Sequence, residues 1–293
     1  MQSKRERTTL TDKVSSRSES GEAAYLRRVV VCGIQRSGTR QFADILNQHP
    51  KVNLHGEIPG SLIVLAGRLM NEADSTYARG FNKAAAQRWR RKRLEVADSL
   101  ISGFSKSFPM SKPDADVLGF KSPHAELEWS SLVEIWGTTR IDFLFCVRNV
   151  KQAYLSYKSM PWAQKTISQY VKRYVNSLEA ATAIAERHSR DHAIGIAILN
   201  LDSFMSDAKQ GSWLARHLFS PLNIACDAKE SQALLEATKN RNATSATSSI
   251  RLRDLDEDEE LFLAGHSRLR SALRAFNRCF GADLELILDH HSS

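Results

Sequence analysis

The sequence predicts an α/β protein of three layers, with a central parallel sheet and a P-loop-like core. Short apolar runs typical of buried strands alternate along the chain with segments in which apolar residues recur at helical spacing. One such run, residues 29–32, leads into a Gly-x4-Gly loop from Gly33 to Gly38. A helical pattern follows the loop at once. Strand, loop and helix in this order form an anion-binding turn, because the backbone N–H groups and the helix N-terminus face the ligand.

Five apolar runs predict the strands of the sheet. Two of them, residues 28–33 and 141–147, are almost continuously apolar, as expected of strands that are buried on both faces. In such a sheet, ligands bind beyond the carboxyl ends of the strands. The predicted strands are residues 28–33, 51–54, 117–120, 141–147 and 193–199.

Apolar spacing of three and four predicts three helical faces. The first follows the glycine loop, the second is the longest, and the third belongs to one late helix. These faces consist of Phe42, Ile45 and Leu46; of Trp162, Ile167, Tyr170, Val171, Tyr174, Val175, Leu178 and Ile184; and of Leu261, Leu269, Leu273 and Phe276.

The chain divides into a polar tail and one domain. Residues 1–24 are rich in charged and hydroxyl side chains, which predicts a flexible tail. Residues 25–290 form the predicted domain, with a mainly helical insertion at about 61–112. The insertion carries the basic run 88–93, which we interpret as a solvated helix face. Contact with an acidic substrate or a nucleic acid is the alternative.

Composition narrows the class of protein. The 293 residues carry a formal net charge of +8, which favours anionic ligands, and no apolar run is long enough to span a membrane. The four cysteines are widely spaced, and Cys32 and Cys146 lie in apolar runs, so we expect buried free thiols in a cytoplasmic protein and no metal site.

The glycine loop differs from that of nucleotide triphosphatases. Those enzymes follow the second glycine with Lys, which reaches the terminal phosphates, and with Ser or Thr, which binds Mg²⁺. Here Thr39 and Arg40 follow Gly38, and a cation stands earlier, at Arg36 beside Ser37. The loop therefore predicts a phosphate or similar oxyanion that is bound without a metal ion.

A second anion-binding pair is predicted at the end of the run 141–147. Arg148 ends this run, and Ser156 lies two turns into a helix expected from Val150. The two side chains can share one anion through charge-assisted hydrogen bonds. An Arg paired with a neighbouring carboxylate and a Ser on a helix surface would produce the same pattern.

Two further strand ends carry charged groups. Lys121 follows residues 117–120, and Glu57 follows the short run that contains His55. Each is by itself compatible with an ordinary solvated side chain or a cap. Several charged groups at the carboxyl ends of strands, together with the modified loop, favour a single site.

Together, these segments resemble the sulfotransferases that use 3′-phosphoadenosine 5′-phosphosulfate (PAPS), over most of residues 28–225. The likeness is greatest to bacterial and Golgi-type members that act on carbohydrates or protein tyrosine. Residues 36–39 resemble that family's loop for the 5′-phosphosulfate, and Arg148 with Ser156 has its Arg-x7-Ser spacing for the 3′-phosphate. The resemblance implies a nucleotide-binding core.

Other segments also resemble the family. Residues 49–50 and 56–57 match the segment that often carries a catalytic Glu, and residues 201–204 with 219–222 resemble a later strand-and-helix block.

There are departures as well. The family often has a second Thr at the position of Arg40, and an aromatic-acidic pair at the position of Leu201 and Asp202. Residues 239–242 are a candidate for the strip that closes over the cofactor, with Arg241 reaching the 3′-phosphate; an exposed polar loop is the alternative.

The resemblance implies a role for each candidate residue. The loop from Ser37 to Arg40 would hold the 5′-phosphate, and Arg36 would stabilise charge on the sulfuryl oxygens. Arg148 and Ser156 would bind the 3′-phosphate.

It also implies an acceptor hydroxyl on a carbohydrate or another small molecule, with no metal ion. Glu57 would take the proton from this hydroxyl, with His55 as the competing base and Lys121 orienting the base or the substrate.

Three alternatives remain at this stage. A nucleotide kinase or triphosphatase would require Mg²⁺ and the missing Lys. A nucleotide-binding module without catalysis would keep the fold. A nucleic-acid-binding protein would use residues 88–93, but the chain has no recognisable nucleic-acid motif. Acceptor contacts are expected from residues 58–112 and from Trp162, and the oligomeric state is open.

Overall fold

The protein is described by a computed structural model. It covers residues 27–79, 83–106, 112, 114–137, 139–242 and 254–284, with only the backbone for residues 239–242. The predicted tail at residues 1–24 lies outside this part of the chain.

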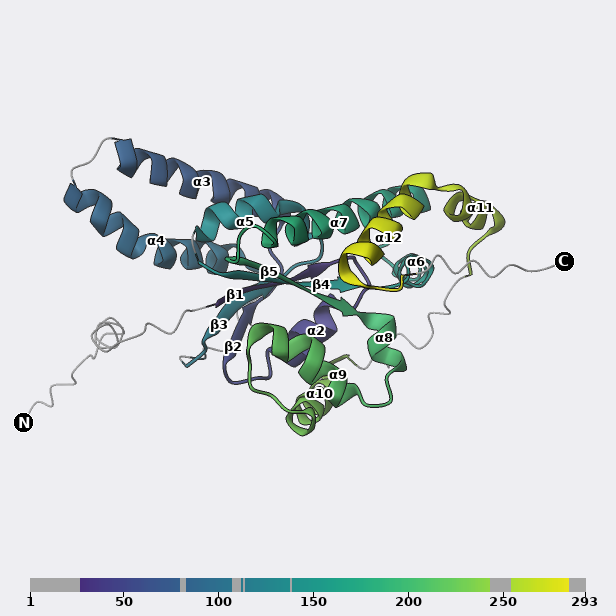
Figure 1. The fold of residues 1–293 in the computed structure, drawn as a ribbon. Coiled ribbons are helices and arrows are strands. Elements are labelled where there is room, and N and C mark those ends of the chain that lie inside the picture. The colour runs from purple at the N-terminus through teal and green to yellow at the C-terminus, as the bar shows by residue number, and fades with distance from the viewer. Residues whose placement is uncertain are drawn as a thin grey trace, which may run out of the picture.

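A five-stranded parallel sheet forms the centre of the described chain (Figure 1). Its strand order is β2-β3-β1-β4-β5, so β1 lies in the middle and pairs with β3 and β4. The sequence-based strands are confirmed to within one residue at each end. The strands are β1 (Arg27–Gly33), β2 (Val52–His55), β3 (Val117–Lys121), β4 (Ile141–Val147) and β5 (Ile194–Asn200).

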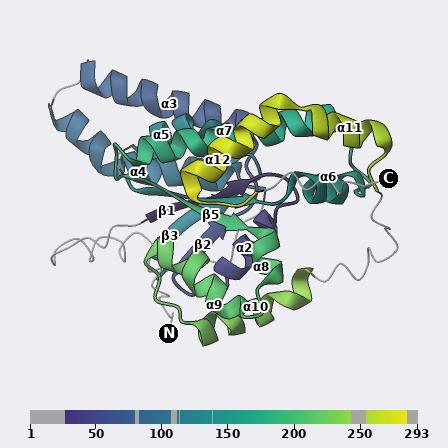
Figure 2. The ribbon, with the colours of Figure 1, turned by 45° about the vertical axis from the view of Figure 1, so that its right-hand side comes forward.

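Helices cover both faces of the sheet, which confirms the three-layer prediction (Figure 2). One layer consists of α3 (Gly60–Arg79), α4 (Lys83–Phe104), α5 (Trp129–Trp136), α6 (Val150–Lys158), α7 (Ile167–His188), α11 (Glu257–Gly265) and α12 (Ser267–Phe280). The other consists of α2 (Thr39–Leu46), α8 (Leu201–Ser206), α9 (Gln210–Leu214) and α10 (Ala228–Asn242), with the π-helix η2 (Ala215–Phe219) and the 3₁₀ helix η3 (Ser220–Leu222). A turn of 3₁₀ helix, η1 (Ala125–Glu128), follows β3.

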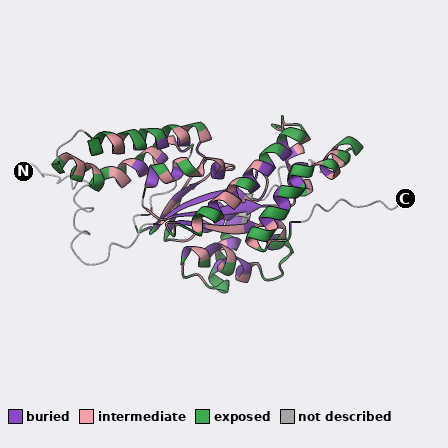
Figure 3. Ribbon diagram, turned by 45° about the horizontal axis from the view of Figure 1, so that its top comes forward, coloured by how far each residue is buried: buried purple, intermediate pink, exposed green. Residues whose placement is uncertain are grey.

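Alternation along β1 connects the two layers. Val30 and Cys32 pack against the layer of α3 to α7, whereas Val29 and Val31 pack against the layer of α2 and α9. Every residue of β4 is buried, as its continuous apolar sequence predicts (Figure 3). Cys32 is a buried free thiol, as expected.

Most of the segment predicted as a helical insertion forms the α3–α4 hairpin, and the helix from Val150 is α6. Asn149 caps α6 by accepting hydrogen bonds from the N–H groups of Lys151 and Gln152. The late helix is instead two helices, α11 and α12, separated at His266.

The helical prediction was wrong at Trp162. The helix begins only at Ile167, because Thr166 forms a capping box with Gln169. Trp162 lies in the turn before it, and 51% of its surface is exposed. Its spacing matched the helical face by coincidence.

The basic run 88–93 lies on α4 and is partly structural. Arg93 binds Asp74 of α3 and donates to the carbonyl of Ile135 at 3.0 Å. Trp89 stacks on Tyr77 with ring centroids 5.1 Å apart. The remaining side chains of the run are exposed, as expected of a solvated face.

An ion pair with a buried guanidinium joins β1 to the hairpin. Arg28 is 1% exposed, and its Nε donates to Oδ1 of Asp98 at 2.9 Å. Trp136 donates its indole N–H to the same oxygen at 3.1 Å. These contacts therefore hold α4 and α5 against the amino-terminal end of β1.

Asp98→Ala is expected to lower the free energy of unfolding by about 3 kcal/mol, because it leaves the Arg28 guanidinium buried without a counter-ion. Chemical denaturation measures this loss. Glu95→Ala removes an exposed carboxylate from the same helix and should change stability by no more than about 0.5 kcal/mol. Equal losses in the two variants would contradict the prediction.

Candidate active site

The glycine loop leaves β1 through backbone conformations that restrict its sequence. Gly33 has φ of 114°, and a Cβ there would lie 2.1 Å from the carbonyl oxygen of Cys146. Gly38 has φ of 84° and forms the N-cap of α2, while Arg36 also has a positive φ of 70°. These values favour glycine at both ends of the loop.

The loop presents backbone donors at the start of α2. Among the described residues, no acceptor is found for the N–H groups of Gly38, Thr39 and Arg40. Ser37 is fully buried, and its hydroxyl oxygen has no hydrogen-bond partner in the described chain. Donors without protein partners at a helix N-terminus fit an anion, as the sequence predicted.

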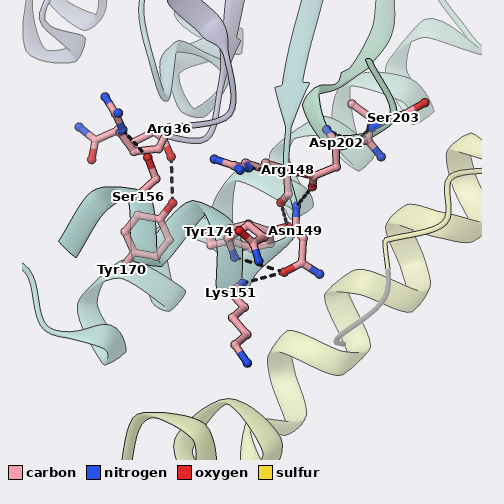
Figure 4. Close-up of polar contacts among 12 residues, drawn as sticks. Arg36, Arg148, Asn149, Lys151, Ser156, Tyr170, Tyr174, Asp202 and Ser203 are labelled. Atoms are coloured by element: carbon pink, nitrogen blue, oxygen red, sulfur yellow. Dashed lines mark hydrogen bonds and ion pairs between the residues drawn. The ribbon is translucent and has the colours of Figure 1, made fainter. Parts of the chain in front are cut away.

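The structure brings the loop and the second predicted pair together. Arg36 Nε donates to Ser156 Oγ at 3.0 Å, although 120 residues separate them in sequence (Figure 4). Tyr170 supports the same loop by donating its hydroxyl to the carbonyl of Gln35 at 2.8 Å. Ser156 of α6 therefore lies beside the glycine loop, in contact with Arg36.

Two guanidinium groups lie near each other in this site. Burial, and after it the charge of Arg148, lowers the pKa of Arg36 from its ordinary value. Figure 4 shows the Arg148 side chain extending toward Ser156 and Arg36. Like charges at this separation repel each other, so a bound anion would stabilise the arrangement.

Arg148 is oriented by a residue to which the sequence analysis assigned no such role. Its Nε donates to Oδ1 of Asp202 at 3.0 Å, and the other carboxylate oxygen accepts from the N–H of Asn149 at 2.7 Å. The Tyr174 hydroxyl donates to the Arg148 carbonyl at 2.7 Å. Among the described residues, the Nη atoms of Arg148 have no hydrogen-bond partner and can receive a ligand.

The expected base and its cation are paired. Lys121 Nζ contacts the Glu57 carboxylate, and the Lys121 side chain is the less exposed of the two. The next residue, Ser122, donates its hydroxyl to the carbonyl of Ile58 at 2.9 Å. The end of β3 thus holds the segment that carries Glu57.

His55 lies close to Glu57 but in a different setting. Glu57 follows the end of β2, so strand alternation does not place the two on one face. The His55 Nδ1 atom is buried without a hydrogen-bond partner among the described residues. Burial lowers the pKa of His55, opposed by the Asp98 carboxylate, so the ring is neutral near pH 7.

Two hollows meet beside the loop. The larger has a volume of about 750 Å³ and is lined by Arg36, Trp162 and Arg173, among others. The smaller has a volume of about 370 Å³ and is lined by His55. Both share Arg40, Glu57, Lys106 and Lys121, so the Glu57–Lys121 pair lies where they join.

Two predicted site residues remain, Arg40 and Arg241. Arg40 is exposed and pairs with Asp44, one turn along α2, at 3.6 Å. Arg241 lies in the last turn of α10, and its side chain is outside the described part of the structure. The backbone of residues 239–242 is helical, so the predicted polar loop does not begin there.

Comparison with known proteins identifies the family. The model of the sulfotransferase family matches residues 28–198, which is more than half of the chain. The chain is a member of the sulfotransferase family. A search among curated proteins found no match.

This sulfotransferase carries most of its candidate residues within the matched segment, from the loop at Arg36 to the pair of Arg148 and Ser156, whereas Arg241 lies beyond it. Membership establishes sulfuryl transfer as its reaction class. Asp202 lies beyond the matched residues. Within the described residues, no three His, Cys, Asp or Glu side chains are grouped to hold a metal ion, and no helix is long and apolar enough to cross a membrane.

His55→Asn is expected to flatten the dependence of the melting temperature on pH. Because the folded-state pKa is lowered, the stability contributed by neutral His55 is complete above its ordinary pKa of 6.5 and is lost as the pH falls below that value. Thermal melts between pH 5 and pH 7.5 measure the slope. His192→Asn, at an exposed position, should keep the wild-type slope; an unchanged slope in His55→Asn would be inconsistent with this account.

Proposed function

We propose that this sulfotransferase transfers a sulfuryl group from PAPS to a hydroxyl of a carbohydrate or another small molecule. The observation that carries the proposal is the hydrogen bond between Arg36 and Ser156, with Arg148 beside it. It joins an anion-binding loop to a second cationic site. A donor with two separate anionic groups fits this pair, whereas a single phosphate would use only one of them.

The residues present fit the donor. The N–H groups from Gly38 to Arg40, with the buried Ser37 hydroxyl, would hold the 5′-phosphate. The free Nη atoms of Arg148, together with Ser156, would bind the 3′-phosphate, which distinguishes PAPS from ATP. The donor supplies the sulfuryl group and the leaving phosphate. Arg36 lies between the two phosphate sites and would stabilise the charge that develops on the leaving group.

The Glu57–Lys121 pair supplies a base. The acceptor oxygen would attack sulfur in line with the bridging oxygen, so one S–O bond forms as the other breaks, and the hydroxyl proton passes to the Glu57 carboxylate. Lys121 orients this carboxylate through their contact. His55 remains the alternative base, since its neutral ring can accept a proton.

The larger hollow is the proposed acceptor cleft. Arg36 lines it, whereas Arg148 and Ser156 do not, so the 3′-phosphate and the acceptor lie on different sides of Arg36. The half-exposed ring of Trp162 packs edge-on against Tyr157 with ring centroids 5.6 Å apart. A fixed, accessible indole in a mainly polar cleft suits the apolar face of a sugar ring.

The remaining expectations are part of the same proposal. Cys146 is a buried free thiol whose pKa is raised well above its ordinary value by burial, and Cys32 behaves alike, which suits a reducing cytoplasm. The basic run 88–93 contributes to the α3–α4 hairpin, so we propose no nucleic-acid partner. We treat residues 25–290 as one domain and assign no oligomeric state.

Adenosine 3′,5′-bisphosphate, the product left by the donor, should raise the melting temperature in the presence of EDTA, whereas ATP with Mg²⁺ should not. At one hundred times the dissociation constant, the bisphosphate adds about 2.7 kcal/mol to the free energy of unfolding. Arg148→Ala should weaken its binding about tenfold or more, because a charge-assisted hydrogen bond is lost.

Thermal melts and calorimetry measure both effects. Arg190 is exposed and lies at the end of the sheet where the strands begin, away from the loop. The variant Arg190→Ala should bind the bisphosphate like the wild type. If ATP with Mg²⁺ stabilised the protein and the bisphosphate did not, the result would indicate a kinase or a triphosphatase instead.

Glu57→Gln should lower the rate of transfer by about 10²- to 10⁴-fold, because it removes a base from the reaction. Its affinity for adenosine 3′,5′-bisphosphate should stay within about twofold of the wild type. The release of bisphosphate from PAPS is followed with a panel of p-nitrophenyl glycosides as acceptors. Glu134→Gln, at an exposed position of α5, is the control; wild-type turnover in Glu57→Gln would transfer the role of base to His55.

A further inference from the structure

The segment after β3 holds the first glycine of the loop from both sides. Glu126 is fully buried, and its Oε2 accepts a hydrogen bond from the N–H of Gly33 at 2.8 Å. The N–H of His124 donates to the carbonyl of Gly33 at 2.9 Å. Both polar groups of the residue at which the chain turns out of β1 are thus bound by one short segment.

The same segment also holds the residues around Glu57. Lys121 contacts the Glu57 carboxylate, and Ser122 binds the carbonyl of Ile58. The N–H of Ser122 donates to the carbonyl of Val31 in β1 at 3.0 Å. Residues 121–126 therefore connect the proposed base to the anion loop.

The position of Glu126 is unfavourable unless the carboxylate has a role. A carboxylate directly behind an anion-binding loop repels the anion, and a buried charge is costly to desolvate. Its Oε1 has no hydrogen-bond partner among the described residues and lies 3.7 Å from Nδ1 of His124. That nitrogen is itself 2.9 Å from the Ser177 hydroxyl. His124 thus offers the carboxylate a polar neighbour but no hydrogen bond.

We propose that Glu126 is a positioning residue for the anion loop and acts through Gly33. By accepting the Gly33 N–H, it fixes the turn at φ of 114° from which the loop donors are directed toward the ligand. Without an acceptor, this buried N–H would be left unsatisfied, and the loop would shift to find another partner. The length of the Glu126 side chain, which brings its oxygen to the Gly33 N–H, is what holds the loop; the negative charge of the carboxylate is not required. The inference rests on the proposed function only in that the loop binds a 5′-phosphate.

Two substitutions of Glu126 distinguish the effect of its side-chain length from the effect of its charge. Glu126→Gln keeps an oxygen at the same distance from Gly33 and removes the charge. Glu126→Asp keeps the charge and shortens the side chain by one methylene. We expect Glu126→Gln to bind adenosine 5′-monophosphate and adenosine 3′,5′-bisphosphate within about threefold of the wild type, and Glu126→Asp to bind both about tenfold more weakly.

Adenosine 3′-monophosphate distinguishes an effect on the loop from a general loss of structure. It lacks the 5′-phosphate, so its affinity should be the same in the wild type and in both variants. Ligand-observed NMR and calorimetry measure the three affinities. Glu134→Gln and Glu134→Asp make the same changes at an exposed position of α5 and should match the wild type throughout.

Each outcome supports or overturns the inference. Equal 5′-phosphate affinities in the two variants, weaker binding in Glu126→Gln than in Glu126→Asp, or an equal loss for the 3′-monophosphate would each overturn it. If the wild type binds the bisphosphate no better than the 5′-monophosphate, the proposed donor is wrong, but the comparison of Gln and Asp still decides the role of Glu126. Absence of any 5′-phosphate binding overturns both.

Discussion

The position of β1 between β3 and β4 is the constraint on which the site depends. Parallel pairing brings the carboxyl ends of these three strands to one edge of the sheet, so Gly33, Lys121 and Arg148 emerge side by side. Gly33 lies so close to the carbonyl of Cys146 that the loop can leave the sheet only where a side chain is absent. Sheet pairing, and not local sequence, sets the spacing of these three residues.

Several cationic side chains lie at this edge of the sheet, and two of them are paired with carboxylates. Asp202 accepts a hydrogen bond from Arg148, and Glu57 pairs with Lys121. Arg36 differs, because it contacts a neutral hydroxyl and no carboxylate of the described residues pairs with it.

Much of this arrangement could be predicted from the sequence, because it follows from local pattern. The apolar runs gave the strands, and the Gly-x4-Gly loop with Arg148 and Ser156 gave the residues that meet in the structure.

Other parts could not be predicted. Asp202 binds Arg148 across 54 residues, and Glu126 binds Gly33 across 93, so neither partnership follows from a motif. The spacing of Trp162 was misleading because the cap at Thr166, whose Thr-x-x-Gln spacing is present in the sequence, starts the helix later.

The α3–α4 hairpin reaches the cleft mainly through its ends, at Gly60, Ile63 and Lys106. None of these belongs to the loop or to the proposed 3′-phosphate pair. The hairpin also contacts the amino-terminal end of β1, which is remote from the loop, through the ion pair of Arg28 and Asp98. Replacing the hairpin would therefore remove the counter-ion of a buried guanidinium at the start of β1, so a substitute would need a carboxylate at the position of Asp98.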